Sequence, residues 1–198
     1  MAKTALFFGT FNPLHIGHLI IAEYFVEHSD LKELWFVITP SNPLKKKSSL
    51  LDEYHRYYMT NMAIEDDSRF KACDIEFKLP YPSYTAHTLT CLREKYPKKE
   101  FVLIMGEDNL ENIEKWKNWE FILENFQIYV YPRIGYHGDK YREHPSVKLV
   151  DAPIIEISST MIRENIKAGK NVKYLLPPKV EQYIDEMGFY KERNSSGA

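Results

Sequence analysis

The stretch "FFGTFNPLHIGHLIIAEYF", residues 7–25, joins an apolar run typical of a buried strand to a run whose apolar residues recur at helical spacing. Gly9 ends the first run, and Asn12 before a proline marks a tight turn. Two histidines, His15 and His18, follow this turn where the helix begins. The stretch therefore predicts a buried strand that passes through a glycine turn into a helix.

The rest of the chain repeats this alternation. Apolar runs predict strands at residues 33–40, 100–106, 126–132 and 147–151, and the alternating segment "FKACDIEFKL", residues 70–79, predicts another. Amphipathic segments predict helices at 16–28, 51–64, 85–95, 120–125, 158–168 and 178–187, with short helix and loop over 108–119. Because most strands are continuously apolar, they indicate a parallel sheet covered on both faces. The predicted fold class is α/β, a doubly wound Rossmann-like parallel sheet with helices on both faces and a small C-terminal helical segment.

Size and charge exclude several classes of protein. A chain of 198 residues buries about two-thirds of its unfolded surface and needs no disulfides. Its two cysteines are isolated, and its N-terminus is neither a signal peptide nor a membrane span, so we expect a cytoplasmic protein. The net charge of -2 argues against a nucleic-acid partner, and we expect no membrane partner. We expect one domain over 1–190, with its C-terminal helical part at about 158–190, and a flexible tail over 191–198.

The turn between the first strand and helix has the chemistry of a phosphate site. Gly9 allows close approach to the backbone, and a helix N-terminus presents unpaired N–H groups at a positive dipole end. His15 and His18 share nearly one helix face and can donate hydrogen bonds to phosphate oxygens, while Gly17 leaves room for something bulky. Two histidines that merely pack or face solvent are the alternative. Zinc is disfavoured, because no Cys, Asp or Glu stands beside the pair.

A second anion-binding pattern lies in "EISSTMIRE", residues 156–164. Consecutive hydroxyls at Ser158, Ser159 and Thr160 enter a helix, where they can cap it and bind an anion, and Arg163 adds a fixed fork for phosphate. An ordinary helix cap is the alternative. Polar residues also follow other strands, in "TPSNPLKKK", "GEDN" and "YPRIGY". Because the carboxyl ends of parallel strands share one sheet edge, we expect these loops to lie close to the loop that follows Gly9.

These two patterns carry a family resemblance. "GTFNPLHIGH" resembles the signature with which the nucleotidyltransferase superfamily holds a nucleoside triphosphate, and "HIGH" also marks class I aminoacyl-tRNA synthetases. "ISSTMIR" is similar to the second superfamily signature, which grips the β- and γ-phosphates of ATP. The synthetases carry a lysine-rich KMSKS element there, which this chain lacks. A nucleotidyltransferase is therefore favoured.

Further segments resemble one family, the nicotinate-mononucleotide adenylyltransferases. They are "PSYTAHTL", "MGEDNLENIEKW", "YPRIGY" with Ile134 in place of the usual proline, and "YLLPPKVEQYIDEMGFY". The matches run in order along essentially the whole chain. The resemblance implies transfer of the adenylyl group of ATP to nicotinate mononucleotide, giving deamido-NAD (nicotinic acid adenine dinucleotide) and pyrophosphate. It also implies Mg²⁺ carried on ATP, with no dedicated protein metal site.

The same resemblance implies the site residues. The histidines at 15 and 18 are expected to act on the ATP phosphates, where deleting one contact costs about 3 kcal/mol in barrier. The expected ATP-binding set is Gly9, Thr10, Phe11, His15, His18, Gly106, Asp108, Ser158, Ser159, Thr160 and Arg163. The expected nicotinate mononucleotide-binding set is Asn12, Lys45, Tyr84, Thr85, Trp116 and Arg133.

Several alternatives stay open on the sequence alone. Trp116 can supply an aromatic face to the pyridinium ring or pack in the core, and Lys45 can contact an anion or belong to a solvated run. The acceptor can be nicotinamide mononucleotide or phosphopantetheine, as in sister enzymes, and a non-catalytic nucleotide-binding module is a further alternative. The many tyrosines hint at a homo-oligomer.

Overall fold

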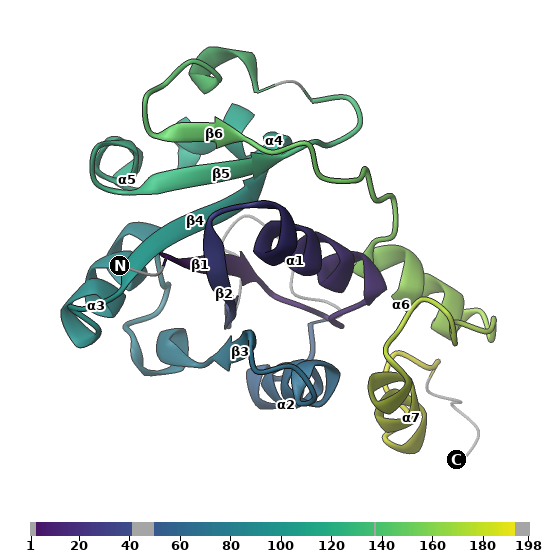
Figure 1. The fold of residues 1–198 in the computed structure, drawn as a ribbon. Helices are drawn as coiled ribbons and strands as arrows, with labels where there is room; N and C mark the ends of the chain where they lie inside the picture. Colours follow the sequence, from purple (N-terminus) through teal and green to yellow (C-terminus); the bar gives the residue numbers. More distant parts are fainter. Residues whose placement is uncertain (1–2, 41–49, 137, 193–198) are drawn as a thin grey trace.

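The computed structural model describes residues 3–40, 50–136 and 138–192, and its core is one parallel sheet (Figure 1). Hydrogen bonds order the strands β3-β2-β1-β4-β5-β6. The strands are β1 (Lys3–Gly9), β2 (Leu31–Ile38), β3 (Phe70–Cys73), β4 (Glu100–Gly106), β5 (Gln127–Tyr131) and β6 (Val147–Leu149). The order reverses beside β1, between β2 and β4, which is where doubly wound sheets bind ligands. The predicted doubly wound parallel sheet is confirmed.

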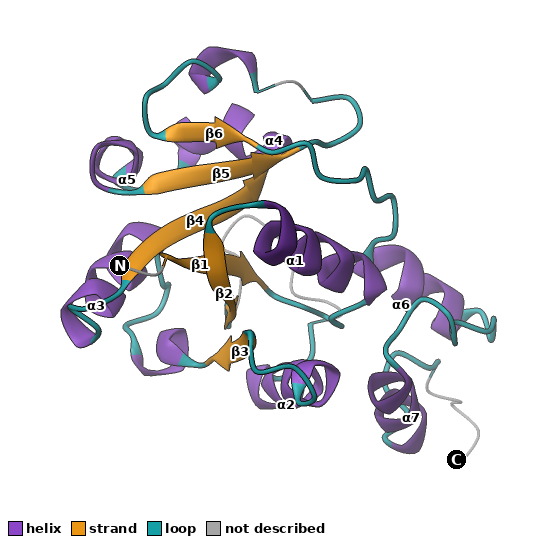
Figure 2. Cartoon of the chain, viewed as in Figure 1, coloured by secondary structure: helices purple, strands orange, loops and turns teal. Residues whose placement is uncertain are grey.

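Helices cover both faces of this sheet (Figure 2). Successive side chains of β1 point to opposite faces, so Phe7 packs with α1 and the end of α2, and Leu6 packs with α3, α4 and α5. The α-helices are α1 (Ile16–His28), α2 (Glu53–Ile64), α3 (Thr85–Lys95), α4 (Glu107–Glu111), α5 (Trp119–Asn125), α6 (Ser159–Lys167) and α7 (Pro178–Glu186). Each strand is thus buried from two sides, as its continuous apolar sequence predicts.

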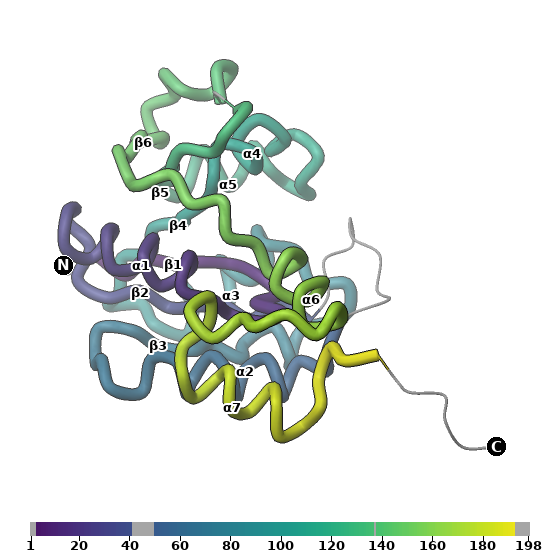
Figure 3. Tube along the Cα trace, turned by 90° about the vertical axis from the view of Figure 1, so that its right-hand side faces the viewer, coloured from purple at the N-terminus to yellow at the C-terminus, as the bar shows by residue number. Residues whose placement is uncertain are grey.

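The C-terminal helices form a third layer beside α2. A separate apolar cluster joins Met59 of α2, Ile162 of α6 and Val180 and Ile184 of α7. Figure 3 shows α7 alongside α2, with α6 next to the start of α1. The backbone N–H of Ile16 donates to the Leu175 carbonyl at 3.0 Å, which ties this layer to the first turn of α1. The C-terminal segment therefore reaches the carboxyl edge of the sheet.

One predicted strand is wrong in part. β3 ends at Cys73, and residues 75–78 form the 3-10 helix η1 (Ile75–Lys78). The side chain of Glu76 is 3% exposed and turns inward to bond Ser83 and Thr88, so the alternating pattern of residues 70–79 does not continue along the sheet edge. Two other short 3-10 helices are η2 (Ile113–Lys115) and η3 (Asp139–Tyr141). Among the described residues, no helix is both long enough and apolar enough to cross a membrane.

Candidate active site

The loop after β1 is tightly packed around its glycine. A Cβ on Gly9 would lie 2.9 Å from the Phe11 ring, so only glycine allows the ring to fold back over the strand end. Phe11 itself has a φ of 44°, in the left-handed region that non-glycine residues rarely adopt. Thr10, between them, is half-buried. The loop is therefore held in one conformation by packing around Phe11.

The two histidines lie face to face at the start of α1. Their ring centroids are 3.7 Å apart with an interplanar angle of 25°. The backbone N–H of His15 donates to His18 Nδ1 at 3.3 Å, which leaves Nε2 as the nitrogen that carries the proton in neutral His18. The Phe11 ring meets the His18 imidazole edge-on at 5.1 Å. The predicted shared face of the two imidazoles is thus observed.

His15 is the buried member of the pair. Its side chain is 3% exposed, and Nδ1 has no hydrogen-bond partner in the described part of the chain. Burial, together with the nearby Arg133 cation, lowers the pKa of His15 from 6.5 to about 4. His15 is therefore neutral at neutral pH, and a neutral imidazole can still donate one hydrogen bond.

The start of α6 docks directly on the first loop. Ser159 Oγ donates to the Pro13 carbonyl at 2.9 Å, and Arg163 Nη1 donates to the Asn12 carbonyl at 2.8 Å. These contacts span 146 and 151 residues of sequence. The two predicted phosphate-binding patterns are consequently neighbours in space.

Hydroxyls at the same helix start remain at the surface. Ser158 is the N-cap of α6, and its Oγ accepts from the Met161 N–H at 3.2 Å. Thr160 Oγ1 accepts from Arg163 Nη2 at 3.2 Å. Ser158 and Thr160 are both exposed. The alternative of a helix cap is thus confirmed for Ser158, and its predicted ligand role stays a prediction.

The ends of β4 and β5 supply a charged pair. A Cβ on Gly106 would lie 2.5 Å from Asp108 Oδ1 and 3.0 Å from Arg133 Cγ, so the glycine makes room for both side chains. Arg133 Nε lies 3.7 Å from Asp108 Oδ1, and the Arg133 backbone N–H donates to Glu107 Oε2 at 3.0 Å. Arg133 therefore stands beside Asp108 and His15, among the residues predicted for ATP. Its predicted role toward nicotinate mononucleotide stays a prediction.

The residues predicted for the acceptor form a second group at the start of α3. Tyr84 is the N-cap of α3 and Thr85 its first residue, and both are half-buried. The Lys117 ammonium lies 4.6 Å from the centre of the Tyr84 ring, which brings the segment containing Trp116 to the same place. Trp116 is half-buried and packs against the core cluster beneath α3. Its ring therefore has one packed side, as the core alternative requires, and its remaining exposure leaves a ligand role open.

Other predicted residues have different surroundings. Asn12 is 4% exposed, and its Oδ1 accepts from the Leu51 N–H at 3.2 Å and the Tyr190 hydroxyl at 2.7 Å. Gly17 is explained by packing, because a Cβ there would lie 2.6 Å from Ile155 Cγ2 and 3.1 Å from the His15 ring. Lys45 lies outside the described residues. The structure therefore gives Asn12 a structural role, while its predicted ligand role remains a prediction.

Two buried ionisable residues behind the loops were missed by the sequence analysis. Arg56 of α2 is fully buried, and Glu76 of η1 is 3% exposed. Arg56 falls on the same helical face as Thr60 and Ile64, both buried, so an arginine in a core-facing stripe was the available signal. Glu76 gave no such signal, because the alternation of residues 70–79 placed it on the polar side.

Within residues 3–40, 50–136 and 138–192, no group of three or more His, Cys, Asp or Glu side chains could hold a metal ion. The charged groups that do gather at the first loop are Arg133 and Arg163, with the start of α6 and of α1. Cations and helix N-termini attract anions. The arrangement is therefore suited to a polyanionic ligand such as a triphosphate.

Comparisons with known proteins agree with this geometry. Residues 6–165 match the model of the cytidylyltransferase-like family. A Flavobacterium johnsoniae protein named "Probable nicotinate-nucleotide adenylyltransferase" is 57% identical over 192 residues, covering 96% of this chain and 100% of that protein. A Bacteroides fragilis protein of the same name is 46% identical over 182 residues, covering 92% and 90%.

A solved structure shares the fold at low identity. It is Plasmodium falciparum nicotinic acid mononucleotide adenylyltransferase complexed with NaAD, with a TM-score of 0.80 at 19% identity, covering 96% of this chain and 98% of that one. At that identity the likeness concerns the fold. The family match and the near full-length relatives show that this chain belongs to the cytidylyltransferase-like family and, within it, to the nicotinate-nucleotide adenylyltransferases.

Proposed function

We propose that the protein transfers the adenylyl group of ATP to nicotinate mononucleotide, forming nicotinic acid adenine dinucleotide and pyrophosphate. The observation that carries this proposal is the docking of the α6 start on the histidine loop, through Ser159 and Arg163. It gathers hydroxyls, a guanidinium and two imidazoles at the carboxyl edge of β1. The near full-length relatives, named for this reaction, support the choice of acceptor.

The reaction needs alignment and charge neutralisation more than proton transfer. The nucleophile is a phosphate oxygen that is already ionised at neutral pH, so no general base is required. The protein must hold it in line with the α-phosphorus and stabilise the charge that develops there. His18 donates from Nε2, and neutral His15 does the same, while Arg163 and Arg133 supply positive charge. Such preorganised donors are the larger part of catalysis in phosphoryl-type transfer.

Mg²⁺ enters with the substrate in this proposal. A triphosphate binds Mg²⁺ through its own oxygens, and the ion keeps several waters. Asp108, after β4, then serves as an acceptor for a ribose hydroxyl, as acidic residues do in dinucleotide folds. Its partner Arg133 lies 3.7 Å away and orients the carboxylate.

The acceptor binds at the start of α3. The first turn of this helix offers backbone N–H groups and the Thr85 hydroxyl to a carboxylate. The Lys117 ammonium above the Tyr84 ring adds a positive charge at the same place. A nicotinate carboxylate suits these donors better than the neutral amide of nicotinamide. Trp116 then offers an aromatic face to the pyridinium ring.

The test is an acceptor panel with purified protein and MgATP. We expect pyrophosphate and a dinucleotide with nicotinate mononucleotide at a higher kcat/KM than with nicotinamide mononucleotide, and no product with phosphopantetheine. A preference for phosphopantetheine would overturn the assignment. A preference for the amide would overturn the acceptor alone.

A paired substitution separates catalysis from binding alone. His18→Ala should lower kcat by roughly 10²-fold, because it removes one donor to the reacting phosphates. His28→Ala, at the exposed far end of the same helix, is the matched control and should leave kcat unchanged. Equal pyrophosphate release by wild type and His18→Ala would contradict the proposed role of this histidine.

A further inference from the structure

Arg56 is a buried cation without a buried anion beside it. Its side chain is fully buried, and within the described residues no carboxylate lies at ion-pair distance from it, although the charges of Glu53 and Asp52 act on it from further away. Burial lowers the pKa of Arg56 to about 10, so the guanidinium still carries its charge at neutral pH. Burying an unpaired charge destabilises a fold unless the charge is fully hydrogen-bonded. The hydrogen-bond partners of Arg56 therefore indicate its role in the fold.

All of its protein partners in the described chain are backbone carbonyls from three segments. Nη1 donates to the Thr10 carbonyl at 2.6 Å and to the Thr39 carbonyl at 2.8 Å. Nη2 donates to the Pro40 carbonyl at 2.7 Å, and Nε to the Leu51 carbonyl at 2.9 Å. These carbonyls belong to the loop after β1, the loop after β2 and the entry to α2. Only a planar guanidinium, whose N–H donors point in fixed directions, can bind all of these carbonyls at once.

The contact with Thr10 acts on the phosphate loop itself. In a trans peptide the C=O and the following N–H point in opposite directions. Because the Thr10 carbonyl faces Arg56, the Phe11 N–H faces away from it. Phe11 also has the rare φ of 44°, which the neighbouring contacts must maintain. Arg56 thus fixes the peptide that precedes this strained residue.

Glu76 lies behind the start of α3, where the acceptor is proposed to bind, as Arg56 lies behind the loop after β1. Its Oε2 accepts from Ser83 Oγ at 2.9 Å and its Oε1 from Thr88 Oγ1 at 2.7 Å. Ser83 precedes the α3 N-cap, and Thr88 lies in the first turns of α3. The Thr39 side chain also lies close enough to Glu76 to oppose the upward shift of its pKa. Glu76 therefore holds the start of α3 from behind.

Thr39 joins the two buried groups. Arg56 binds its carbonyl, and Glu76 interacts with its side chain. Its backbone N–H donates to the Gly9 carbonyl at 2.9 Å, which fixes it to the end of β1. A continuous polar network, buried at Arg56 and Glu76 and half-buried at Thr39, therefore runs from the predicted phosphate loop to the start of α3.

We propose that Arg56 and Glu76 are positioning residues joined through Thr39. Arg56 holds the triphosphate loop and Glu76 holds the acceptor-binding start of α3, so that the two segments keep the relative position that in-line attack requires. Neither residue is placed to touch substrate. Each residue acts through the segment that it holds. Loss of Arg56 should therefore misplace ATP, and loss of Glu76 should misplace nicotinate mononucleotide. The inference rests on the proposed function for the identity of the acceptor, while the effect on ATP binding can be measured independently of it.

The experiment compares full-length variants by steady-state kinetics and by the shift of the thermal midpoint on adding MgATP. Arg56→Met should weaken MgATP binding and lower kcat/KM by about 10²-fold, the scale of a misplaced reacting group. Arg56→Lys keeps the positive charge but lacks the planar set of guanidinium donors. Its loss of kcat/KM should therefore be smaller than that of Arg56→Met, without reaching the wild-type value. Glu76→Gln keeps the shape and should raise the KM for nicotinate mononucleotide, with MgATP binding close to that of wild type.

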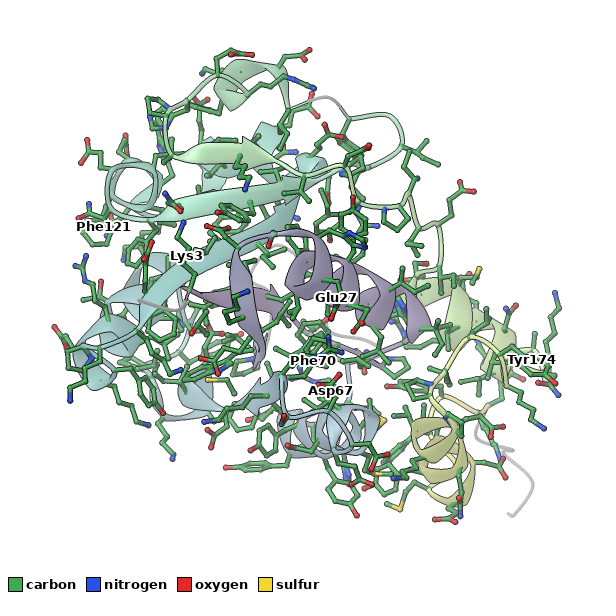
Figure 4. All side chains as sticks on the ribbon, in the orientation of Figure 1. Lys3, Glu27, Asp67, Phe70, Phe121 and Tyr174 are labelled. Carbon is green, nitrogen blue, oxygen red and sulfur yellow. The ribbon has the colours of Figure 1, made fainter. Side chains whose placement is uncertain are left out.

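Arg69 provides a matched control. It is also an arginine with several partners, Glu23, Glu27 and Asp67. Because it precedes β3, it lies at the amino ends of the strands, opposite the carboxyl edge that carries the candidate site. Figure 4 shows Glu27 and Asp67 beside Phe70, the first residue of β3. Arg69→Met should lower the thermal midpoint and leave both KM values and kcat unchanged.

The outcomes separate the two proposals. Folded Arg56→Met and Glu76→Gln with wild-type kinetics and MgATP shift, or with changes no larger than those of Arg69→Met, would overturn the positioning role. If Arg56→Met does not fold, Arg56→Lys and Glu76→Gln decide the question. A wild-type protein that binds MgATP yet forms no dinucleotide would overturn the proposed function, and MgATP binding by the Arg56 variants would still test the positioning role.

Discussion

His15 shows how much a side chain's environment changes its chemistry. A histidine in water titrates near pH 6.5, but burial beside Arg133 lowers the pKa of His15 to about 4. The two stacked imidazoles, 3.7 Å apart, would repel each other if both were charged, and a neutral His15 removes that repulsion. In the proposed reaction, neutral His15 therefore contacts phosphate as a hydrogen-bond donor, while the arginines provide the charge.

This shift predicts a pH dependence of stability. Between pH 6.5 and about 4, the unfolded chain binds a proton at His15 that the folded chain does not, so stability falls as the pH drops through this window. The full loss, below the folded pKa, is about 3 kcal/mol. Urea unfolding should therefore show a smaller acid-induced loss for His15→Asn than for wild type.

His28→Asn serves as the control, because His28 is exposed at the other end of α1. This variant should lose stability in acid as wild type does. The same acid-induced loss for His15→Asn and wild type would contradict the burial argument.

At the scale of elements, the loop between β3 and α3 is organised by one carboxyl group. Glu76 brings η1, the loop at Ser83 and the first turns of α3 together through its two oxygens. Desolvation raises the pKa of Glu76 above its ordinary value, although the hydroxyl donors oppose this shift. The local structure of residues 75–88 therefore depends on a long-range polar contact.

The raised pKa of Glu76 predicts the opposite sign from that of His15. The folded chain keeps this proton to higher pH than the unfolded chain, so the associated stability is present at low pH and is lost as pH rises through the folded pKa. Glu76→Gln cannot ionise and should lack this loss. Relative to wild type, its free energy of unfolding should therefore rise as the pH increases above the ordinary range of a glutamate. A difference between the two proteins that stays constant as the pH rises would contradict this prediction.

At the scale of the whole molecule, the sheet and the C-terminal helices share the site. Ser159 and Arg163 of α6 bind carbonyls of the first loop, and the segment before α7 binds the N–H of Ile16. The cluster beneath α7 also includes Met59 of α2, the helix that carries Arg56. These contacts indicate that the C-terminal part unfolds together with the sheet.

Ile184→Ala tests this cooperation. Ile184 is 3% exposed in the C-terminal cluster, so its truncation should cost about 2–5 kcal/mol. The chain's three tryptophans, residues 35, 116 and 119, all pack in the other cluster, beneath α3. If the molecule is one cooperative unit, the tryptophan-fluorescence midpoint should fall by the same amount as the circular-dichroism midpoint.

Tyr174→Ala is the matched control in the same C-terminal part. Tyr174 is 87% exposed and projects from the edge of the molecule (Figure 4), so both midpoints should stay in place. An unchanged fluorescence midpoint in Ile184→Ala, beside a shifted circular-dichroism midpoint, would show that the C-terminal helices unfold separately.

The sequence by itself determined the elements whose signals are local. The bounds predicted for α1 and α3 agree with the structure, because apolar spacing and the flanking turn residues act within a few residues. The doubly wound parallel sheet was predicted from continuously apolar strands, which are stable only when both faces are covered. The two phosphate-binding patterns were also visible, since glycine, hydroxyl and histidine are chemically distinctive.

Only the tertiary structure decided which of these groups meet and in which charge state. Arg56 and Glu76 acquire their roles from carbonyls and hydroxyls that lie elsewhere along the chain, so no local pattern reveals them. The neutrality of His15 comes from burial and from Arg133, 118 residues further on. Local sequence encodes backbone preference, whereas burial and long-range hydrogen bonds exist only once the chain has folded. "GTFNPLHIGH" therefore predicted a phosphate-binding turn, and folding determined the surroundings of its histidines.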